Sequence, residues 1–155
     1  LPQFLTFIKD RNVALRFIEL MRTSDNVDYY RRHHVSGQEI KTQLLQQGWV
    51  QRLKSHNDGP AQEFSHPDYA GQMGLIMPYS KDFCYDCNRL RVSSLGQLFL
   101  CLFTEQHQDI RQYLQTDDPE PLMKALQNNI MLKQATHGLH DENSGATRHL
   151  AMIGG

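Results

Sequence analysis

The chain has 155 residues, 16 Lys and Arg against 17 Asp and Glu, 39% hydrophobic residues and three cysteines. This length allows one domain, or one domain and part of another, with a core large enough to form without disulfides. The net charge of −1, the short apolar runs and the odd cysteine number predict a soluble, cytoplasmic protein that binds neither nucleic acid nor membrane.

The first residues predict a helix followed by a strand. The chain begins at Leu1, inside an amphipathic pattern that is not a signal peptide, so we expect it to be cut from a longer protein. Residues 2–11 have helical spacing, and Val13–Met21 is a near-continuous apolar run of strand length. Such runs are typical of parallel strands covered on both faces. This order predicts the last step of an α/β barrel or a doubly wound sheet.

A second helix is predicted after Ser36. Ser36 and Glu39 form an S-x-x-E capping box, in which each side chain satisfies a backbone N–H at the helix start. Gly48 is a suitable residue for the end of this helix. The predicted buried stripe consists of Ile40, Leu44 and Leu45.

The segment 49–103 predicts short strands separated by turns. Turn residues occupy positions 58–60, and Gly74–Pro78 has the pattern of a strand. Arg89–Phe103 divides into two short runs around Ser94–Gly96, which predicts a hairpin.

Two helices and a tail are predicted after the hairpin. Ile110, Tyr113 and Leu114 indicate a short helix, and Asp118 with Pro119 indicates the start of a longer one. The apolar face of the longer helix consists of Leu122, Ala125, Leu126 and Ile130. From Gly138 onward the periodicity is weak, so we predict an irregular tail.

The three cysteines form a candidate metal site. Cys84 and Cys87 have C-x2-C spacing, which lets two thiolates converge on one metal, and a hairpin after them returns Cys101. Buried thiols in a sheet are the alternative. Structural zinc needs four ligands, so His107 would complete a Cys₃His site in a small interaction module without catalysis. In an iron–sulfur cluster, three cysteines would leave one iron open to a substrate.

Arg89 and Arg91 directly follow the cysteine loop. In a strand, these two side chains point to the same face. Two guanidinium groups beside a metal site form a fork for phosphate or for the edge of a nucleobase. A solvated strand face is the alternative.

The block from Asp82 to Ser93, followed by Gly96 and Cys101–Phe103, resembles the C-terminal part of the radical S-adenosylmethionine GTP cyclases of molybdenum cofactor biosynthesis. The resemblance spans essentially the whole chain. Three further segments agree with this family: Arg16–Met21, Asp58–Ala61 and Gly154–Gly155.

The resemblance implies an α+β chain. Residues 1–23 would be the last helix and strand of an incomplete, TIM-like α/β barrel. Residues 24–155 would form a C-terminal domain of short antiparallel strands and helices. In this family the reaction converts GTP by radical chemistry towards cyclic pyranopterin monophosphate.

The resemblance also implies roles for particular residues. Cys84, Cys87 and Cys101 would hold a [4Fe–4S] cluster with an open iron for the guanine. The GTP site would be lined by Arg89, Leu90 and Arg91.

Two further positions are implied by the resemblance alone. Met21 would contact S-adenosylmethionine, although the residue type alone favours a place in the core. Gly154 and Gly155 would reach back into the active site, where glycine lets the backbone approach a ligand, with a frayed terminus as the alternative.

One motif of the family is missing from this sequence. The C-x3-C-x2-C loop, which holds the cluster that cleaves S-adenosylmethionine, does not occur. We therefore expect an inactive piece of a lyase whose partner is the missing N-terminal barrel half of the same chain. The parent protein is expected to be a homodimer.

Overall fold

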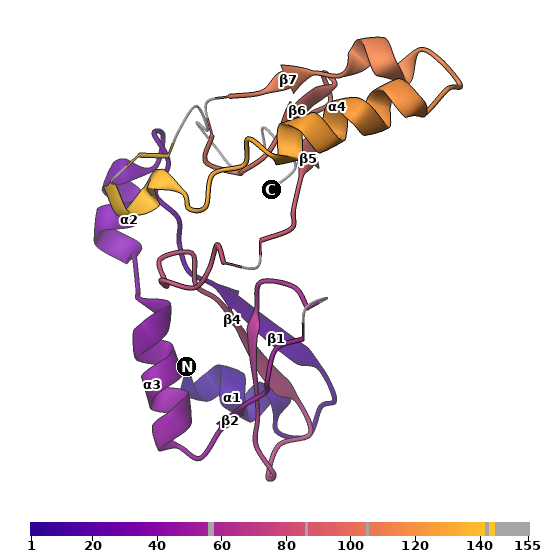
Figure 1. The fold of residues 1–155 in the computed structure, drawn as a ribbon. Helices are drawn as coiled ribbons and strands as arrows, with labels where there is room; N and C mark the ends of the chain where they lie inside the picture. The colour runs from indigo at the N-terminus through magenta and orange to yellow at the C-terminus, as the bar shows by residue number, and fades with distance from the viewer. Residues whose placement is uncertain (56–57, 86, 105, 142, 145–155) are drawn as a thin grey trace. The chain divides into compact units, whose positions relative to one another are not determined.

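The structure is a computed structural model, and it describes residues 1–55, 58–85, 87–104, 106–141 and 143–144. Contacts divide the chain, shown in Figure 1, into two compact units. Unit 1 comprises Leu1–Leu20 and Arg31–Asp86, and unit 2 comprises Met21–Tyr30 and Cys87–Gly155. The predicted boundary between residues 1–23 and 24–155 separates the barrel of a longer protein from its C-terminal domain, and it stays a prediction.

Unit 1 contains a four-stranded mixed sheet in the order β1-β4-β3-β2. Its strands are β1 (Ala14–Ile18), β2 (Val50–Gln51), β3 (Gln62–Ser65) and β4 (Gln72–Ile76). β1 and β4 run parallel, with Phe17 opposite Leu75, and the other two pairs are antiparallel. The carboxyl ends of β1 and β4 therefore lie at the same edge of the sheet.

β1 is parallel to its neighbour, as predicted, but it is not covered on both faces. The strand spans Ala14–Ile18 rather than Val13–Met21, and exposed residues alternate with half-buried ones along it. Ile18 is 61% exposed. Within the described residues β1 is an edge strand that pairs only with β4, so the prediction of burial on both faces is wrong here.

The first helix, α1 (Pro2–Ile8), ends before the predicted residue 11 because the chain that leads into β4 binds its end. The carbonyl of Ile8 accepts the N–H of Gly71 (3.0 Å), and that of Lys9 accepts the N–H of Ala70 (2.7 Å). A Cβ at Gly71 would lie 2.8 Å from the Ile8 Cβ and 2.7 Å from the Arg11 carbonyl oxygen. Only glycine fits this approach of two backbones.

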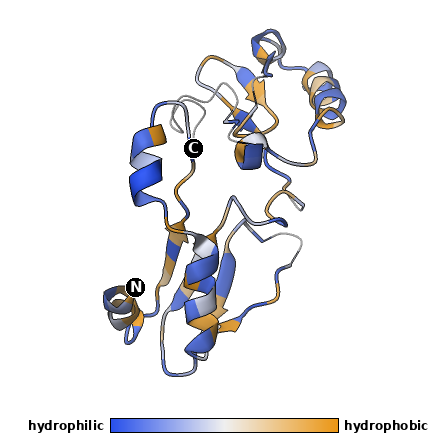
Figure 2. Cartoon of the chain, turned by 90° about the vertical axis from the view of Figure 1, so that its left-hand side faces the viewer, coloured by the Kyte–Doolittle hydropathy of each residue, from blue (hydrophilic) through white to orange (hydrophobic). Residues whose placement is uncertain are grey.

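The helix α2 (Val27–His33) was not predicted. It buries no residue, and most of it is hydrophilic in Figure 2. Asp28 lies in its first turn, and the last turn contains Arg31, Arg32 and His33. This charge order complements the helix dipole and is the sequence signal that indicates the helix.

The helix α3 (Gly37–Gln46) begins and ends as predicted. The Ser36 hydroxyl accepts a backbone N–H of the first turn at 3.2 Å. At the other end the N–H of Trp49 donates to the Leu44 carbonyl (3.0 Å), and the N–H of Gly48 donates to the Leu45 carbonyl (3.1 Å). Gly48 has φ +85°, so the helix closes in a Schellman motif.

The buried stripe of α3 is narrower than predicted. Leu44 is fully buried in the core of unit 1, and Ile40 packs against that core. Leu45 is 46% exposed, because it lies about 100° around the helix from Leu44. The core consists of Leu5, Ile8, Leu44, Trp49, Phe64, Met73, Leu75 and Met77.

Unit 2 contains a three-stranded antiparallel sheet in the order β5-β6-β7. Its strands are β5 (Arg91–Val92), β6 (Gln97–Phe99) and β7 (Gln108–Asp109). The predicted hairpin is confirmed, and its turn contains Gly96 with φ +70°.

The predicted helices of unit 2 are present with two corrections. The helical elements are the 3₁₀ helices η1 (Arg111–Leu114) and η2 (Gly138–Asp141) and the helix α4 (Glu120–Ile130). The N-cap residue of α4 is Pro119, and the Asp118 side chain before it accepts the Glu120 N–H at 3.0 Å. Ile130 is 46% exposed and so lies outside the buried face. The predicted irregular tail is wrong at its start, because η2 buries Leu139. None of the described helices is long and apolar enough to cross a membrane.

The two leucines of α3 give a matched test of this core. We expect Leu44→Ala to lower the free energy of unfolding by about 2–5 kcal/mol, because it leaves a cavity under a fully buried side chain. Leu45→Ala removes the same atoms from an exposed position and should change it by about 0.5 kcal/mol or less. Urea denaturation measures both. Equal losses in the two variants would contradict the described orientation of α3.

Candidate functional site

The three predicted cysteine ligands are thiols, and all are half-buried. Cys84 lies after β4 and belongs to unit 1, whereas Cys87 and Cys101 belong to unit 2. Among the described residues, no three His, Cys, Asp or Glu side chains are grouped so that they could hold a metal ion. The structure therefore places two of the predicted ligands in one unit and the third in the other.

Cys87 lies among positive charges. Burial by itself raises the pKa of the Cys87 thiol, but a hydrogen bond from the Arg89 backbone and the charges of Lys133 and Arg89 outweigh this effect. The pKa of Cys87 is therefore lowered from its ordinary value of 9.0. The ammonium of Lys133 lies 3.6 Å from the Cys87 Sγ. This environment favours the thiolate, which is the form that binds metal.

Arg91 belongs to the same group of charges. Burial and the charge of Arg89 lower the pKa of Arg91, and electrostatic attraction to Cys101 and Cys87 opposes this shift. The guanidinium thus interacts with both cysteines of unit 2. Arg89 precedes β5 and Arg91 begins it, so the two arginines do not share a strand as predicted. Leu90, between them, is half-buried.

Cys101 lies just after β6, which is the return strand of the hairpin. Its Sγ accepts the backbone N–H of Phe103 at 3.4 Å. Leu102 and Phe103 are buried, so the chain that carries Cys101 is anchored directly after it.

The donor chemistry of this group fits a thiolate-bound iron–sulfur cluster. Cys87 is stabilised as a thiolate, and a hydrogen bond to sulfur reaches Cys101. Thiolates are the usual ligands of such clusters, and hydrogen bonds to sulfur and net charge tune them. Sequence analysis missed Lys133, because no motif marks it. The one sequence feature that could have marked Lys133 is its position next to the apolar residues Met131 and Leu132 at the end of a predicted helix.

His107, the fourth ligand of the zinc alternative, is exposed. Its ring centroid lies 5.3 Å from that of Phe99, in a tilted arrangement. It belongs to no group of three metal-binding side chains in the part of the chain that the structure describes.

Met21 belongs to unit 2 and is half-buried. Its carbonyl accepts the side-chain amide of Asn26 at 2.9 Å, and the Asn26 oxygen accepts the N–H of Thr23 at 2.8 Å. The chain after β1 is thus held in a defined turn. The predicted site residues Gly154 and Gly155 lie outside the described residues.

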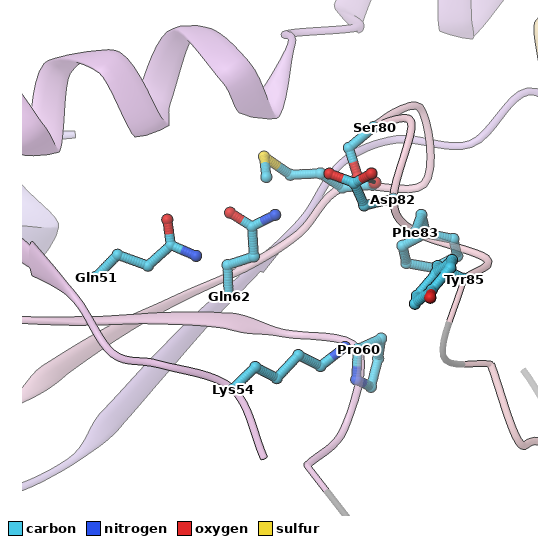
Figure 3. A pocket seen from close by; sticks show the side chains of 9 residues that line it. Gln51, Lys54, Pro60, Gln62, Ser80, Asp82, Phe83 and Tyr85 are labelled. Atoms are coloured by element: carbon cyan, nitrogen blue, oxygen red, sulfur yellow. Dashed lines mark hydrogen bonds between the residues drawn. The ribbon is translucent and has the colours of Figure 1, made fainter. Parts of the chain in front are cut away.

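A cavity of about 330 Å³ lies in unit 1, and the loop that carries Cys84 forms one of its walls. Asp82, Phe83 and Tyr85 line it from this loop, as Figure 3 shows. Gln51 and Gln62 extend towards it from β2 and β3. Its polar and aromatic walls are compatible with a polar ligand.

Comparisons with known proteins identify the family. The family described as Molybdenum Cofactor Synthesis C matches residues 13–139. The chain belongs to this family. It is 55% identical over its whole length to the GTP 3′,8-cyclase of Vibrio parahaemolyticus, and 54% and 53% identical to those of Vibrio cholerae and Pectobacterium atrosepticum. The chain spans about half (47%) of the length of these three relatives.

The molybdenum cofactor synthesis family was therefore correctly predicted from the cysteine–arginine block.

In this family member an ion pair lies beside the hairpin that connects Arg91 to Cys101. Arg111 donates from Nε to both carboxylate oxygens of Asp109 at 3.0 Å, and its backbone N–H donates at 2.9 Å. The carbonyl of Gly96, in the hairpin turn, accepts the N–H of Ile110 at 2.9 Å. The ion pair thus stabilises residues 109–111, which bind the hairpin turn through the N–H of Ile110.

This pair predicts a measurable pH dependence. The side-chain and backbone hydrogen bonds from Arg111 lower the pKa of Asp109 from 3.8 to about 2. A carboxylate with a lowered folded-state pKa stabilises the fold above its unfolded pKa and loses this contribution as pH falls through the folded value. We expect the difference in melting temperature between wild type and Asp109→Asn to shrink between about pH 4 and pH 2. NMR titration of the Asp109 carboxyl tests the cause, and an unperturbed pKa of 3.8 would contradict it.

Proposed function

We propose that this chain is the C-terminal, GTP-binding part of a GTP 3′,8-cyclase, in which Cys84, Cys87 and Cys101 hold a [4Fe–4S] cluster. The observation that carries the proposal is the group of positive charges around the Cys87 sulfur in unit 2. The identity of the whole chain to enzymes of that name supports it. The alternative is the zinc module, in which His107 would be the fourth ligand, and the reconstitution experiment below separates the two.

Arg89 and Arg91 are proposed to bind the nucleotide. Their guanidinium groups provide fixed donors for phosphate oxygens or for the acceptor edge of guanine. Arg91 is half-buried next to Arg89 and retains this charge beside Cys87 and Cys101. The backbone of Leu90 is proposed to complete the site. When bound, a three-thiolate cluster supplies one iron without a protein ligand, at which a guanine nitrogen or oxygen can bind.

The remaining parts of the reaction are proposed to belong to the longer protein. The exposed edge of β1 fits a strand of an α/β barrel that continues beyond this pairing, and barrel active sites lie at the carboxyl ends of strands. Met21, directly after that end, is proposed to contact S-adenosylmethionine. This chain alone has no cysteines for a radical-generating cluster and is expected not to cleave S-adenosylmethionine. The homodimer and the cytoplasmic location stay predictions.

Anaerobic reconstitution tests the proposal directly. We expect the chain to bind about four irons and four sulfides and to absorb visible light, because three thiolates hold one cubane cluster. Cys101→Ser should lower the iron content first and GTP binding as a consequence. Chemical iron and sulfide analysis measures this. Stoichiometric zinc binding without visible absorption would instead support the interaction module and reject the cluster.

Arg91→Ala separates nucleotide binding from cluster binding. Loss of one charge-assisted hydrogen bond typically costs about 1.5–3 kcal/mol, so GTP affinity should fall about 10- to 100-fold. Iron content and melting temperature should stay near the wild-type values. Arg11→Ala, which removes the same charge from unit 1, is the control. Isothermal titration of GTP measures the affinity. If Arg91→Ala unfolds the chain while GTP binding per folded molecule survives, Arg91 is structural and the nucleotide site is wrong.

A further inference from the structure

Lys133 binds the segment that carries Cys87 and Arg89. Its ammonium donates to the carbonyl oxygens of Cys87 (2.8 Å) and Arg89 (2.9 Å), and it lies 3.6 Å from the Cys87 Sγ. A lysine ammonium has three N–H donors. These three acceptors all lie on one short stretch of chain, so a single side chain fixes that stretch at both of its ends.

Apolar packing does not explain why Lys133 points inward. It is half-buried, whereas its apolar neighbours Met131 and Leu132 are 83% and 68% exposed. This order reverses the usual preference, in which lysine is the exposed residue. The turn after α4 presents the side chain, since the N–H of Lys133 donates to the Ile130 carbonyl at 3.0 Å. The polar contacts therefore hold Lys133 in place.

We propose that Lys133 is a positioning residue for the cluster and nucleotide site, and this inference rests on the proposed function. Its two carbonyl contacts fix the backbone on either side of Asn88, so the Cys87 sulfur and the Arg89 guanidinium keep their relative placement. Its charge beside the sulfur offsets the negative charge of a thiolate-bound group. Residues that orient metal ligands in this way typically change metal affinity about 10- to 100-fold when they are replaced.

The test compares Lys133→Met, Lys133→Arg and Lys124→Met with the wild-type chain after anaerobic reconstitution. Lys133→Met keeps the length of the side chain but removes its charge and donors. Lys133→Arg keeps the charge and donors. Lys124→Met makes the same change on α4, where the Lys124 side chain is 74% exposed and pairs with Glu120. The readouts are the rate of iron loss to a chelator, the reduction potential of the cluster, and the melting temperature of the metal-free chain.

We expect Lys133→Met to lose iron about 10- to 100-fold faster than wild type and to have a more negative reduction potential, because a positive charge next to the sulfur is gone. Lys133→Arg should recover most of both properties, and Lys124→Met should match the wild type. The metal-free melting temperature should be unchanged in all three variants.

Three results would overturn the inference. Wild-type iron retention and potential in Lys133→Met would show that Lys133 does not position the site. If Lys133→Met fails to fold, the residue is structural. The same conclusion follows if the melting temperature of its metal-free form is as much below that of wild type as the melting temperature of its cluster-bound form. Equal effects of Lys124→Met would show that only net charge matters. If the wild-type chain itself takes up no iron, the proposed function fails, which is distinct from these three results.

Discussion

A half-buried thiolate needs nearby positive charge, and this requirement organises the part of unit 2 that precedes and follows the hairpin. Burial raises the pKa of the Cys87 thiol, and hydrogen bonds from the backbone and side chain of Arg89, together with the charges of Lys133 and Arg89, bring it below its ordinary value. Arg91 also interacts electrostatically with Cys87 and Cys101. The same cations can bind an anionic ligand, because a nucleotide phosphate, like a thiolate, is stabilised by nearby positive charges.

Unit 1 presents an unpaired strand edge among the described residues. Its parallel pair, β1 and β4, is the minimal element of an α/β sheet, and β1 has no described partner on its other side. Ile18 is exposed on this strand, although its residue type favours burial. An edge strand of this kind is an open site for strand pairing. The chain spans about half the length of the relatives it matches, and we propose that the barrel of the longer protein supplies a strand at this edge.

The features that sequence analysis predicted correctly depend on local residues. The cap at Ser36, the Schellman motif at Gly48 and the hairpin turn at Gly96 each follow from a few adjacent positions. The cysteine–arginine block was found because its residues are close in sequence. Lys133 was missed because its contact with Cys87 joins residues 46 positions apart. Periodicity likewise does not show that a strand such as β1 lies at an edge.

The proposed function depends on a cluster that the three cysteines hold with one iron open to the nucleotide. Mössbauer spectroscopy of the ⁵⁷Fe-reconstituted chain, with and without GTP, tests it most directly. We expect about one iron in four to have no thiolate ligand, and the signal of this iron alone to shift when GTP is added. Four equivalent irons, or a spectrum that GTP leaves unchanged while the nucleotide is bound, would contradict it.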